Sequence, residues 1–267
     1  MVIEKNDVSL YVEVKGEGEA LLLIHGVIVD AGLYERTSEI LSKCYKVITY
    51  DRRGNSRSIL KEGADPCFTM DDQADDIRDI LDALGVEKTY VVGASGGAAV
   101  GQFFMKKYPE KVKHLIMYEP SALGMLAAED EETAAWTEEM HRLIEKKRYN
   151  SVLLRFSESI GAPDSRSPVR SEEDSMRQYG NIEYAFTVEF PGLVRNPPDI
   201  EFMKAVKDRI TLAAGEKSGD SKYVRIARML AEKTGCRLVY YPGGHNLPFE
   251  LPEEFAICVI GTLILQI

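Results

Sequence analysis

The feature that most constrains the fold is an alternation of short apolar runs with segments of helical spacing. The runs are rich in β-branched and aromatic residues, which is typical of buried strands. Between two of them, the segment 70–84 places its apolar residues on one helical face. Apolar strands that alternate with such helices predict an α/β fold, with a mostly parallel sheet covered by helices on both faces. The predicted strands are 8–14, 20–24, 45–50, 89–92, 114–118, 210–213 and 237–241.

Length and charge narrow the class of protein. The chain has 267 residues, of which 45% are hydrophobic, so it can bury the core of one domain with an elaboration. The formal net charge of -10 argues against nucleic acid or an anionic membrane surface as the main partner. The N-terminal residues lack the apolar core of a signal peptide, and no apolar run approaches the roughly 20 residues of a membrane span. We therefore expect a cytoplasmic protein, and the sequence carries no signature of an oligomeric state.

The four cysteines do not form a recognisable metal or disulfide pattern. No CxxC pair occurs among Cys44, Cys67, Cys236 and Cys258, and few histidines lie near them. Zinc sites and disulfide frameworks both need closer spacing or a different context. We expect reduced, buried thiols that behave as small apolar side chains.

The alternation of strands and helices stops between about 121 and 208. There the sequence becomes charged and helical, with scattered aromatic residues. Prolines divide the stretch, which predicts several short helices joined by loops. The sequence therefore predicts an insertion between two strands of the sheet. The prolines are Pro163, Pro168, Pro191, Pro197 and Pro198.

A serine at a tight strand-to-helix junction is the strongest chemical signal. The strand 89–92 runs into a Gly-x-Ser-x-Gly pattern centred on Ser95. Such a turn needs small residues at Gly93 and Gly97, because larger side chains would collide. The helix N-terminus beneath the serine favours developing negative charge. A phosphate loop would need GxxxxGK[ST] and a dinucleotide fold GxGxxG, and neither pattern occurs here. We predict Ser95 as a nucleophile.

Serine needs an imidazole to take its proton, so one of the four histidines must reach Ser95. His114 lies at the start of a predicted strand and His141 in a charged, helix-like run, so we interpret both as structural. His245 follows the last predicted strand on a loop with two glycines, ahead of a final helix predicted at 252–264. Such a loop lets the ring swing over the sheet edge. We predict His245 as the base.

Four segments together resemble the α/β-hydrolase fold family over essentially the whole chain. They are Leu-Leu-Leu-Ile-His-Gly at 21–26, Tyr-Asp-Arg-Arg-Gly-Asn-Ser-Arg-Ser at 50–58, the serine turn, and Pro-Gly-Gly-His-Asn at 242–246. The resemblance implies an eight-stranded, mostly parallel sheet with helices on both faces and a helical cap inserted after the sixth strand. It assigns 1–120 and 209–267 to the core domain and 121–208 to the cap.

In this family, two backbone N–H groups hold the oxyanion, one after the His-Gly pair and one after the nucleophile. The resemblance assigns these roles to Val27 and Gly96, and a backbone donor tolerates any side chain at these positions. It also implies that His25 braces the oxyanion loop. The guanidinium groups of Arg52 and Arg53 resemble an anion clamp, but the family likeness favours a structural loop.

The acid departs from the usual family pattern. Many members carry it in a Gly-x-x-Asp turn after the seventh strand, where this chain has Ser218. Asp220 lies two residues further on. It and Ser221 immediately precede a segment of helical spacing, so N-capping is the stronger interpretation of either residue. Glu216 is a further alternative in the same turn.

The family can also place its acid at the end of the sixth strand, from which a carboxylate reaches the same histidine. Here that residue is Glu119, and we expect Pro120 to hold it extended. The chain is similar at this point to lactone-cleaving α/β-hydrolases that act on zearalenone, whose acid is a glutamate after this strand. We predict Glu119 as the acid. A buried pair between Glu119 and an arginine such as Arg53 is the structural alternative.

These residues predict a serine hydrolase that cleaves a carboxylic ester or lactone through an acyl-enzyme, with Ser95, His245 and Glu119 as its triad. Neither a metal nor an organic cofactor is required. Aromatic and methionine residues of the insertion favour a small to medium, largely apolar substrate, although packing explains them equally well. The same fold also carries C–C bond hydrolysis, perhydrolysis, hydroxynitrile cleavage and cofactor-free oxygenation. A non-enzymatic ligand-binding module is the alternative from another class.

Overall fold

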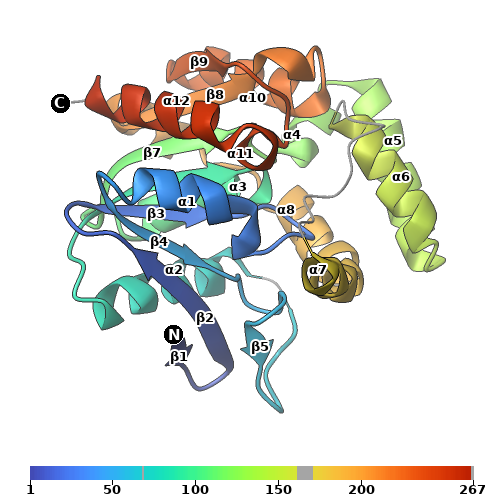
Figure 1. Cartoon of the computed structure of the whole chain (residues 1–267). Coiled ribbons are helices and arrows are strands. Elements are labelled where there is room, and N and C mark those ends of the chain that lie inside the picture. Colours follow the sequence, from blue (N-terminus) through green and yellow to red (C-terminus); the bar gives the residue numbers. More distant parts are fainter. Residues whose placement is uncertain (68, 161–170, 266–267) are drawn as a thin grey trace.

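The computed structural model describes residues 1–67, 69–160 and 171–265. Its centre is a mostly parallel sheet, which confirms the predicted α/β class (Figure 1). The strand order is β1-β2-β4-β3-β6-β7-β8-β9, and β5 pairs with β2. The strands are β1 (Val2–Glu4), β2 (Val8–Lys15), β3 (Ala20–Ile24), β4 (Lys46–Tyr50), β5 (Ile59–Leu60), β6 (Thr89–Ala94), β7 (Val112–Tyr118), β8 (Ile210–Gly215) and β9 (Arg237–Tyr241).

Every apolar run predicted as a strand forms one, and its ends shift by at most two residues. The structure adds β1 and β5 in the described part of the chain. β1 has three residues, of which the middle one is half-buried, and β5 has two residues. Strands this short contain too few apolar positions to show a period. The seven predicted strands and β1 form a continuous path of eight, the number that the family resemblance implies, and β5 lies off this path.

Helices cover both faces of the sheet, as predicted. Alternate residues of β3 point to opposite sides, so Leu22 belongs to the buried cluster that includes residues of α2, α3 and α10, whereas Leu23 belongs to the cluster that includes residues of α1 and α12. The final helix has its predicted bounds. The helices and helical turns outside the insertion are η1 (Ala31–Tyr34), α1 (Glu35–Leu41), α2 (Met70–Ala83), α3 (Gly96–Lys107), η4 (Glu216–Ser218), α10 (Lys222–Thr234), α11 (Leu247–Glu250) and α12 (Pro252–Ile264).

Helices fill the sequence between β7 and β8 and gather beside one end of the sheet (Figure 1). Several are short, as predicted, whereas α5 and α7 are longer, with 15 and 13 residues. Pro191 lies in the first turn of α8, and Pro197 and Pro198 precede α9. Pro163 and Pro168 lie outside the described residues. The helices are α4 (Leu123–Ala127), α5 (Glu131–Glu145), α6 (Tyr149–Ser159), α7 (Glu172–Tyr184), the π-helical turn η2 (Ala185–Glu189), α8 (Phe190–Arg195), α9 (Ile200–Ala205) and the 3-10 turn η3 (Lys207–Arg209).

The cysteines are free, but the expectation that all four are buried is wrong. Cys236 is buried and Cys258 half-buried, whereas Cys44 and Cys67 are exposed. Cys44 lies in the turn between α1 and β4, and Cys67 in the loop before α2, so both belong to connecting segments at the surface. Burial of a cysteine therefore follows from its place in the fold rather than from its residue type.

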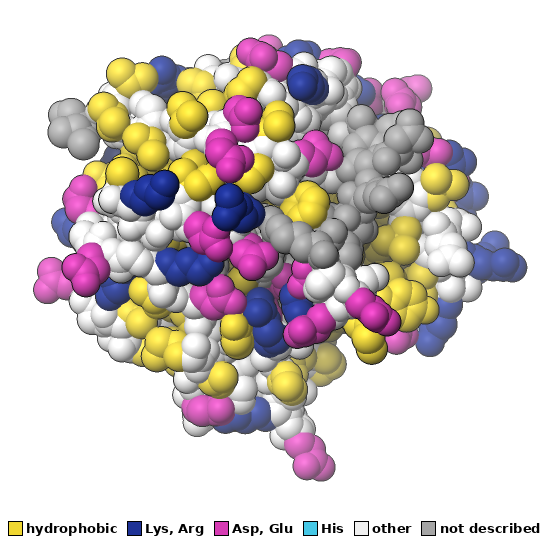
Figure 2. Space-filling model, in the orientation of Figure 1, with side chains coloured by type: hydrophobic (Ala, Val, Ile, Leu, Met, Phe, Trp, Pro, Cys, Tyr) yellow, Lys and Arg dark blue, Asp and Glu magenta, His cyan; other side chains and the backbone are white. Residues whose placement is uncertain are grey.

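The surface mixes charges of both signs. On the face shown in Figure 2, acidic side chains are interspersed with basic ones rather than gathered into one field. Within the described ranges, no helix combines the length and apolarity that crossing a membrane requires.

Candidate active site

Ser95 occupies a strained turn between β6 and α3. Its φ of +54° and ψ of -120° lie outside the regions that residues other than glycine ordinarily adopt. The surrounding backbone fixes this conformation. The Ser95 N–H donates to the Tyr118 carbonyl at 2.9 Å, and the Ser95 carbonyl accepts from the Ala98 and Ser121 N–H groups at 3.1 Å each. Strain held by so many contacts is characteristic of functional positions.

The two glycines of the serine pattern are required by close backbone approach, as predicted. A Cβ added at Gly93 would collide with the carbonyl oxygen of Gly97. A Cβ added at Gly97 would collide with the carbonyl oxygen of Ile24. Both obstacles are main-chain atoms, which a side-chain rotation cannot relieve. The turn therefore depends on glycine at both positions.

Glu119 lies directly after β7 and is buried, at 0% exposed. Its Oε1 accepts from the Gly215 N–H at 2.8 Å, and its Oε2 lies 2.6 Å from Nδ1 of His245. Its own N–H donates to the Ala213 carbonyl at 2.8 Å. The expectation of an extended residue before Pro120 is wrong, because these contacts hold Glu119 at a φ of +42°. The structure thus brings the glutamate and the histidine into direct contact.

His245 lies on the loop between β9 and α11. Contacts with two tyrosines and with Glu119 hold this loop in place. The Tyr118 hydroxyl donates to the Gly244 carbonyl at 2.5 Å, while Glu119 holds Nδ1. The ring of Tyr223 packs against the imidazole with a centroid separation of 4.7 Å. With Nδ1 on Glu119, the other ring nitrogen is available to a partner in the pocket that His245 and Ser95 line together.

Tyr223 is a residue of this site that the sequence reasoning missed. It is 1% exposed and comes from the first turn of α10. Burial raises the pKa of its hydroxyl, and hydrogen bonding with the side chains of Ser159 and Ser95 partly opposes that increase. No local pattern marks a tyrosine at this position, because its neighbours in the site come from distant parts of the chain.

The alternative acids lie elsewhere. Asp220 is exposed and pairs with Arg228 at 2.8 Å. Ser221 is the N-cap of α10, as one of the two residues predicted for that role, and its hydroxyl accepts from the Val224 N–H. Glu216 is an exposed residue of η4. Among the interactions of the described residues, neither Asp220 nor Glu216 contacts His245.

The structural alternative for Glu119 is also wrong. The guanidinium of Arg53 donates to both carboxylate oxygens of Asp76 at 2.7 Å, and to Asp7 at 2.8 Å. The carboxylate of Glu119 instead contacts the Gly215 N–H and the His245 ring. Arg53 is therefore satisfied on the side of α2 and does not neutralise Glu119.

The backbone after β3 lies against the serine turn. A Cβ placed on Gly26 would lie 3.1 Å from the Cβ of Ser95, and one placed on Gly96 would lie 3.8 Å from the Val27 nitrogen. Gly96 is the first residue of α3, so its N–H has no partner within the helix. Among the described residues, neither the Val27 nor the Gly96 N–H has an acceptor. Within the part of the chain that the structure describes, two backbone donors without an acceptor therefore lie next to the serine.

His25 braces this loop, as predicted. It is completely buried, its Nδ1–H donates to the Gly26 carbonyl at 2.7 Å, and its Nε2 accepts from the Arg52 N–H at 2.9 Å. Burial, followed by the charge of Arg52, lowers the pKa of His25 to about 3. The ring is therefore neutral at pH 7, with its proton on Nδ1, and cannot serve as a base while both nitrogens are engaged.

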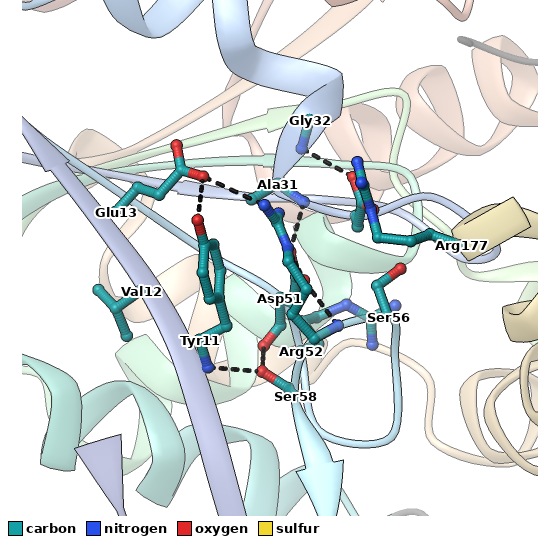
Figure 3. A network of polar contacts seen from close by, with 12 residues as sticks. Tyr11, Val12, Glu13, Ala31, Gly32, Asp51, Arg52, Ser56, Ser58 and Arg177 are labelled. Carbon is teal, nitrogen blue, oxygen red and sulfur yellow. Dashed lines mark hydrogen bonds and ion pairs between the residues drawn. The ribbon is translucent and has the colours of Figure 1, made fainter. Parts of the chain in front are cut away.

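The loop after β4 is structural, as the family likeness indicated (Figure 3). The buried carboxylate of Asp51 accepts from the Ala31 N–H at 2.9 Å and from the Arg57 N–H at 3.0 Å. Ser58 donates its hydroxyl to the Asp51 carbonyl and accepts from the Tyr11 N–H. Arg52 and Arg53 are each paired with a buried carboxylate. No free anion clamp is left in this loop.

A pocket of about 670 Å³, including its open mouth, lies in front of Ser95 and His245. The loop after β3 supplies Val27, Ile28 and Val29, while Leu153 and Phe156 come from α6 of the insertion. Among the described residues that line the pocket, none is Lys, Arg, Asp or Glu. Within the described ranges, no group of three or more His, Cys, Asp or Glu side chains is placed to hold a metal ion. The pocket is thus apolar around a small polar centre.

Comparison with known proteins agrees with this architecture. The chain is 28% identical over 253 residues, which cover 93% of it and 90% of the relative, to the uncharacterized hydrolase YraK of Bacillus subtilis (strain 168). It is 30% identical over 128 residues to the 2-hydroxy-6-oxo-6-phenylhexa-2,4-dienoate hydrolase of Comamonas testosteroni, covering 45% of this chain and 42% of that one.

A solved structure from a study of carboxylesterases of Nitrososphaera gargenis superposes with a TM-score of 0.77 at 20% identity, covering 100% of this chain and 98% of the other. A family model described as the alpha/beta hydrolase fold matches residues 19–199, which is more than half of the sequence. The parallel sheet, the serine turn after β6 and this match together establish that the chain belongs to the α/β-hydrolase fold family.

Proposed function

We propose that this protein is a serine hydrolase that cleaves a neutral carboxylic ester or lactone through an acyl-enzyme. The observation that carries the proposal is the buried contact between Glu119 and His245, 2.6 Å long, beside the pocket that Ser95 and His245 share. A carboxylate on Nδ1 keeps the other ring nitrogen unprotonated, which is the form that accepts a proton from serine. Relatives named as hydrolases support the same class of reaction.

In the proposed reaction, Ser95 attacks the substrate carbonyl while His245 takes the serine proton on Nε2. Glu119 stabilises the His245 imidazolium that forms. The imidazolium then gives its proton to the departing alkoxide. Water then attacks the acyl-enzyme while His245 takes a proton from the water. The imidazolium returns this proton to Ser95 Oγ as the bond to the acyl group breaks, which releases the acid and restores the serine hydroxyl. The Val27 and Gly96 N–H groups stabilise the oxyanion of both tetrahedral intermediates.

The lining of the pocket supports an uncharged substrate. The named substrate of the Comamonas relative is a dienoate, whose carboxylate would need a cationic or multiply donating partner. No Lys or Arg occurs among the described lining residues, and Arg52 is buried against Glu189. We therefore favour an ester or lactone with apolar acyl and alcohol parts over C–C bond hydrolysis of an anionic dienoate.

We further propose that 1–120 and 209–267 form the catalytic core and 121–208 the cap. The helix α6 supplies Leu153 and Phe156 to the pocket, and Ile160 follows at its end. These side chains face the serine from the insertion, so the insertion would set the size of the group that the site accepts. This assignment makes the cap a determinant of substrate range rather than of the reaction itself.

Labelling with a fluorophosphonate probe tests the proposal. We expect the intact mass of the wild type to increase by one adduct, and Ser95→Ala to show none. Ser218→Ala is the matched control, because Ser218 is a buried serine near Gly244, in the loop that carries His245. We expect this variant to form the same adduct as the wild type. Esters and lactones of increasing acyl length then identify the substrate class. A folded wild type that forms no adduct would contradict the proposal and favour a binding role.

A further inference from the structure

The peptide bond between Gly26 and Val27 is held from its carbonyl side. Two buried side chains donate to the Gly26 oxygen, His25 through Nδ1 at 2.7 Å and Arg52 through Nη2 at 2.9 Å. A peptide is planar and trans, so its C=O and N–H point in opposite directions. Fixing the Gly26 carbonyl therefore fixes the direction of the Val27 N–H, which is the donor assigned above to the oxyanion.

Arg52 holds both the Gly26 carbonyl and the His25 ring that donates to it. It is completely buried, and besides the Gly26 carbonyl it donates through Nε to the His25 carbonyl at 3.1 Å. Its backbone N–H holds Nε2 of His25, which leaves the proton of the ring on Nδ1 for the Gly26 oxygen. One arginine thus controls both donors on the same carbonyl. Hydrogen bonds to a carbonyl also polarise the amide and strengthen its N–H as a donor.

The charge of Arg52 is balanced by a residue of the insertion. Glu189, at the end of η2, is 0% exposed and accepts from Nη1 of Arg52 at 2.6 Å and from Nη2 at 3.1 Å. The same carboxylate accepts from the amide of Asn55 at 3.0 Å. An unpaired guanidinium at this depth would be very unfavourable, so the position of Arg52 depends on Glu189.

The same part of the insertion holds the oxyanion loop at a second point. The amide of Asn181, in α7, donates to the Ile28 carbonyl at 2.7 Å. Ile28 has a φ of +74°, which is strained for a β-branched residue, so this loop does not adopt its shape unaided. The segment 181–189 therefore holds the loop directly at Ile28, through Asn181, and indirectly at Gly26, through the pairing of Glu189 with Arg52.

We propose that Arg52 and Glu189 are positioning residues of the oxyanion hole, acting through the Gly26–Val27 peptide, so that the insertion completes the catalytic site. This inference rests on the proposed function, because it assigns the oxyanion role to the Val27 N–H. It extends the role of the insertion from shaping the pocket to orienting a catalytic donor.

The neighbouring pair of Arg53 and Asp76 provides a matched control. It is also buried and bidentate, and it comes from the same loop, but it joins the loop to α2 and does not touch the residues around Val27. Glu189→Gln and Asp76→Asn make the same chemical change in the two pairs. A general loss of stability is expected from both, whereas a loss of oxyanion stabilisation is expected from Glu189→Gln alone.

The experiment measures kcat and KM for a p-nitrophenyl ester, together with inhibition by an alkylthio trifluoromethyl ketone, which forms a hemiketal oxyanion on serine. For Glu189→Gln we expect kcat to fall by roughly ten- to a hundredfold, the inhibitor to weaken by a similar factor, and KM to change little. For Asp76→Asn we expect both values to stay near those of the wild type. Equal losses in the two variants, or none in Glu189→Gln, would overturn the inference.

If Glu189→Gln does not fold, the double variant Arg52→Met with Glu189→Leu replaces the pair by apolar side chains, a change that buried ion pairs often tolerate. It should fold and show the same loss of kcat, and wild-type values in this variant would refute the positioning role. Amide hydrogen exchange over residues 25–30 gives a readout without substrate. Faster exchange there in Glu189→Gln than in Asp76→Asn is expected even if the wild type proves not to hydrolyse esters, so failure of the proposed function is recognised separately.

Discussion

Replacing Glu119 by glutamine tests the acid with almost no change in shape. The wild-type carboxylate accepts two hydrogen bonds, from the Gly215 N–H at 2.8 Å and from His245 at 2.6 Å. Glutamine has one oxygen, and the buried Gly215 N–H needs it as an acceptor. The amide NH₂ would then face Nδ1 of His245, which must become an acceptor. The ring proton moves to Nε2, the nitrogen that should accept the serine proton.

The size of the effect follows from this competition. Turning the amide so that its oxygen faces His245 leaves the Gly215 N–H without an acceptor, which costs about 1–3 kcal/mol. Even then the imidazolium has lost the neighbouring negative charge. Wrong tautomer and lost charge together lower turnover by about 10⁴-fold in the corresponding substitution of a serine protease triad. We expect a decrease of about 10³- to 10⁴-fold here, which corresponds to roughly 4 to 5.5 kcal/mol in the barrier.

The assay is hydrolysis of a p-nitrophenyl ester, with thermal unfolding as the test of folding. Asp220→Asn is the matched control, because its side chain is exposed and pairs with Arg228 away from the pocket. We expect its kcat to stay within about twofold of the wild type. A folded Glu119→Gln variant whose kcat is within tenfold of the wild type would refute the assignment, as would a large loss in Asp220→Asn.

Three further predictions concern the turn, the pocket and the pH dependence of stability. Gly97→Ala should lose most activity and more than about 2 kcal/mol of unfolding free energy, since its Cβ meets the Ile24 carbonyl; urea unfolding checks this. Phe156→Ala should shift the preferred acyl chain to longer esters, and an unchanged chain-length profile would argue against the pocket. Burial lowers the pKa of His114 to about 4, so the unfolded chain binds a proton there below about pH 6.5 that the folded protein does not. The free energy of unfolding of the wild type should therefore decrease as the pH is lowered through this range. Between pH 7 and pH 5 the wild type should lose about 2 kcal/mol more than His114→Asn, which lacks the titrating ring.

Local sequence patterns predicted the parts of this protein whose cause is local. The strand runs, the final helix and Gly93 each depend on neighbouring residues, and the structure has them where the patterns indicated. Gly97 fits the same local pattern, although the atom that excludes a side chain there is the distant Ile24 carbonyl oxygen. Glu119 could be nominated because the ends of neighbouring parallel strands meet at one edge of a sheet. Its backbone conformation could not, since contacts from Ala213 and Gly215 override the preference of a residue before proline.

The residues that sequence reasoning missed owe their roles to distant partners. Glu189 was a lone acid within an apolar stretch, which was the one available hint of a buried pair, but its partner Arg52 lies 137 residues away in the chain. Tyr223 reaches His245 only because α10 packs on the sheet beside the loop that carries the histidine. Such pairs become visible when tertiary structure brings the elements together.

In the proposed reaction Ser95 becomes covalently acylated during turnover, and rapid quenching can trap that acyl-enzyme. The wild type would be mixed with an excess of a p-nitrophenyl ester, quenched in acid within the first turnovers and mapped by peptide mass spectrometry. We expect the acyl group on the peptide that contains Ser95, and we expect His245→Ala to form it far more slowly. Steady hydrolysis with no acyl group on Ser95, or with the acyl group on another residue, would contradict the proposed reaction.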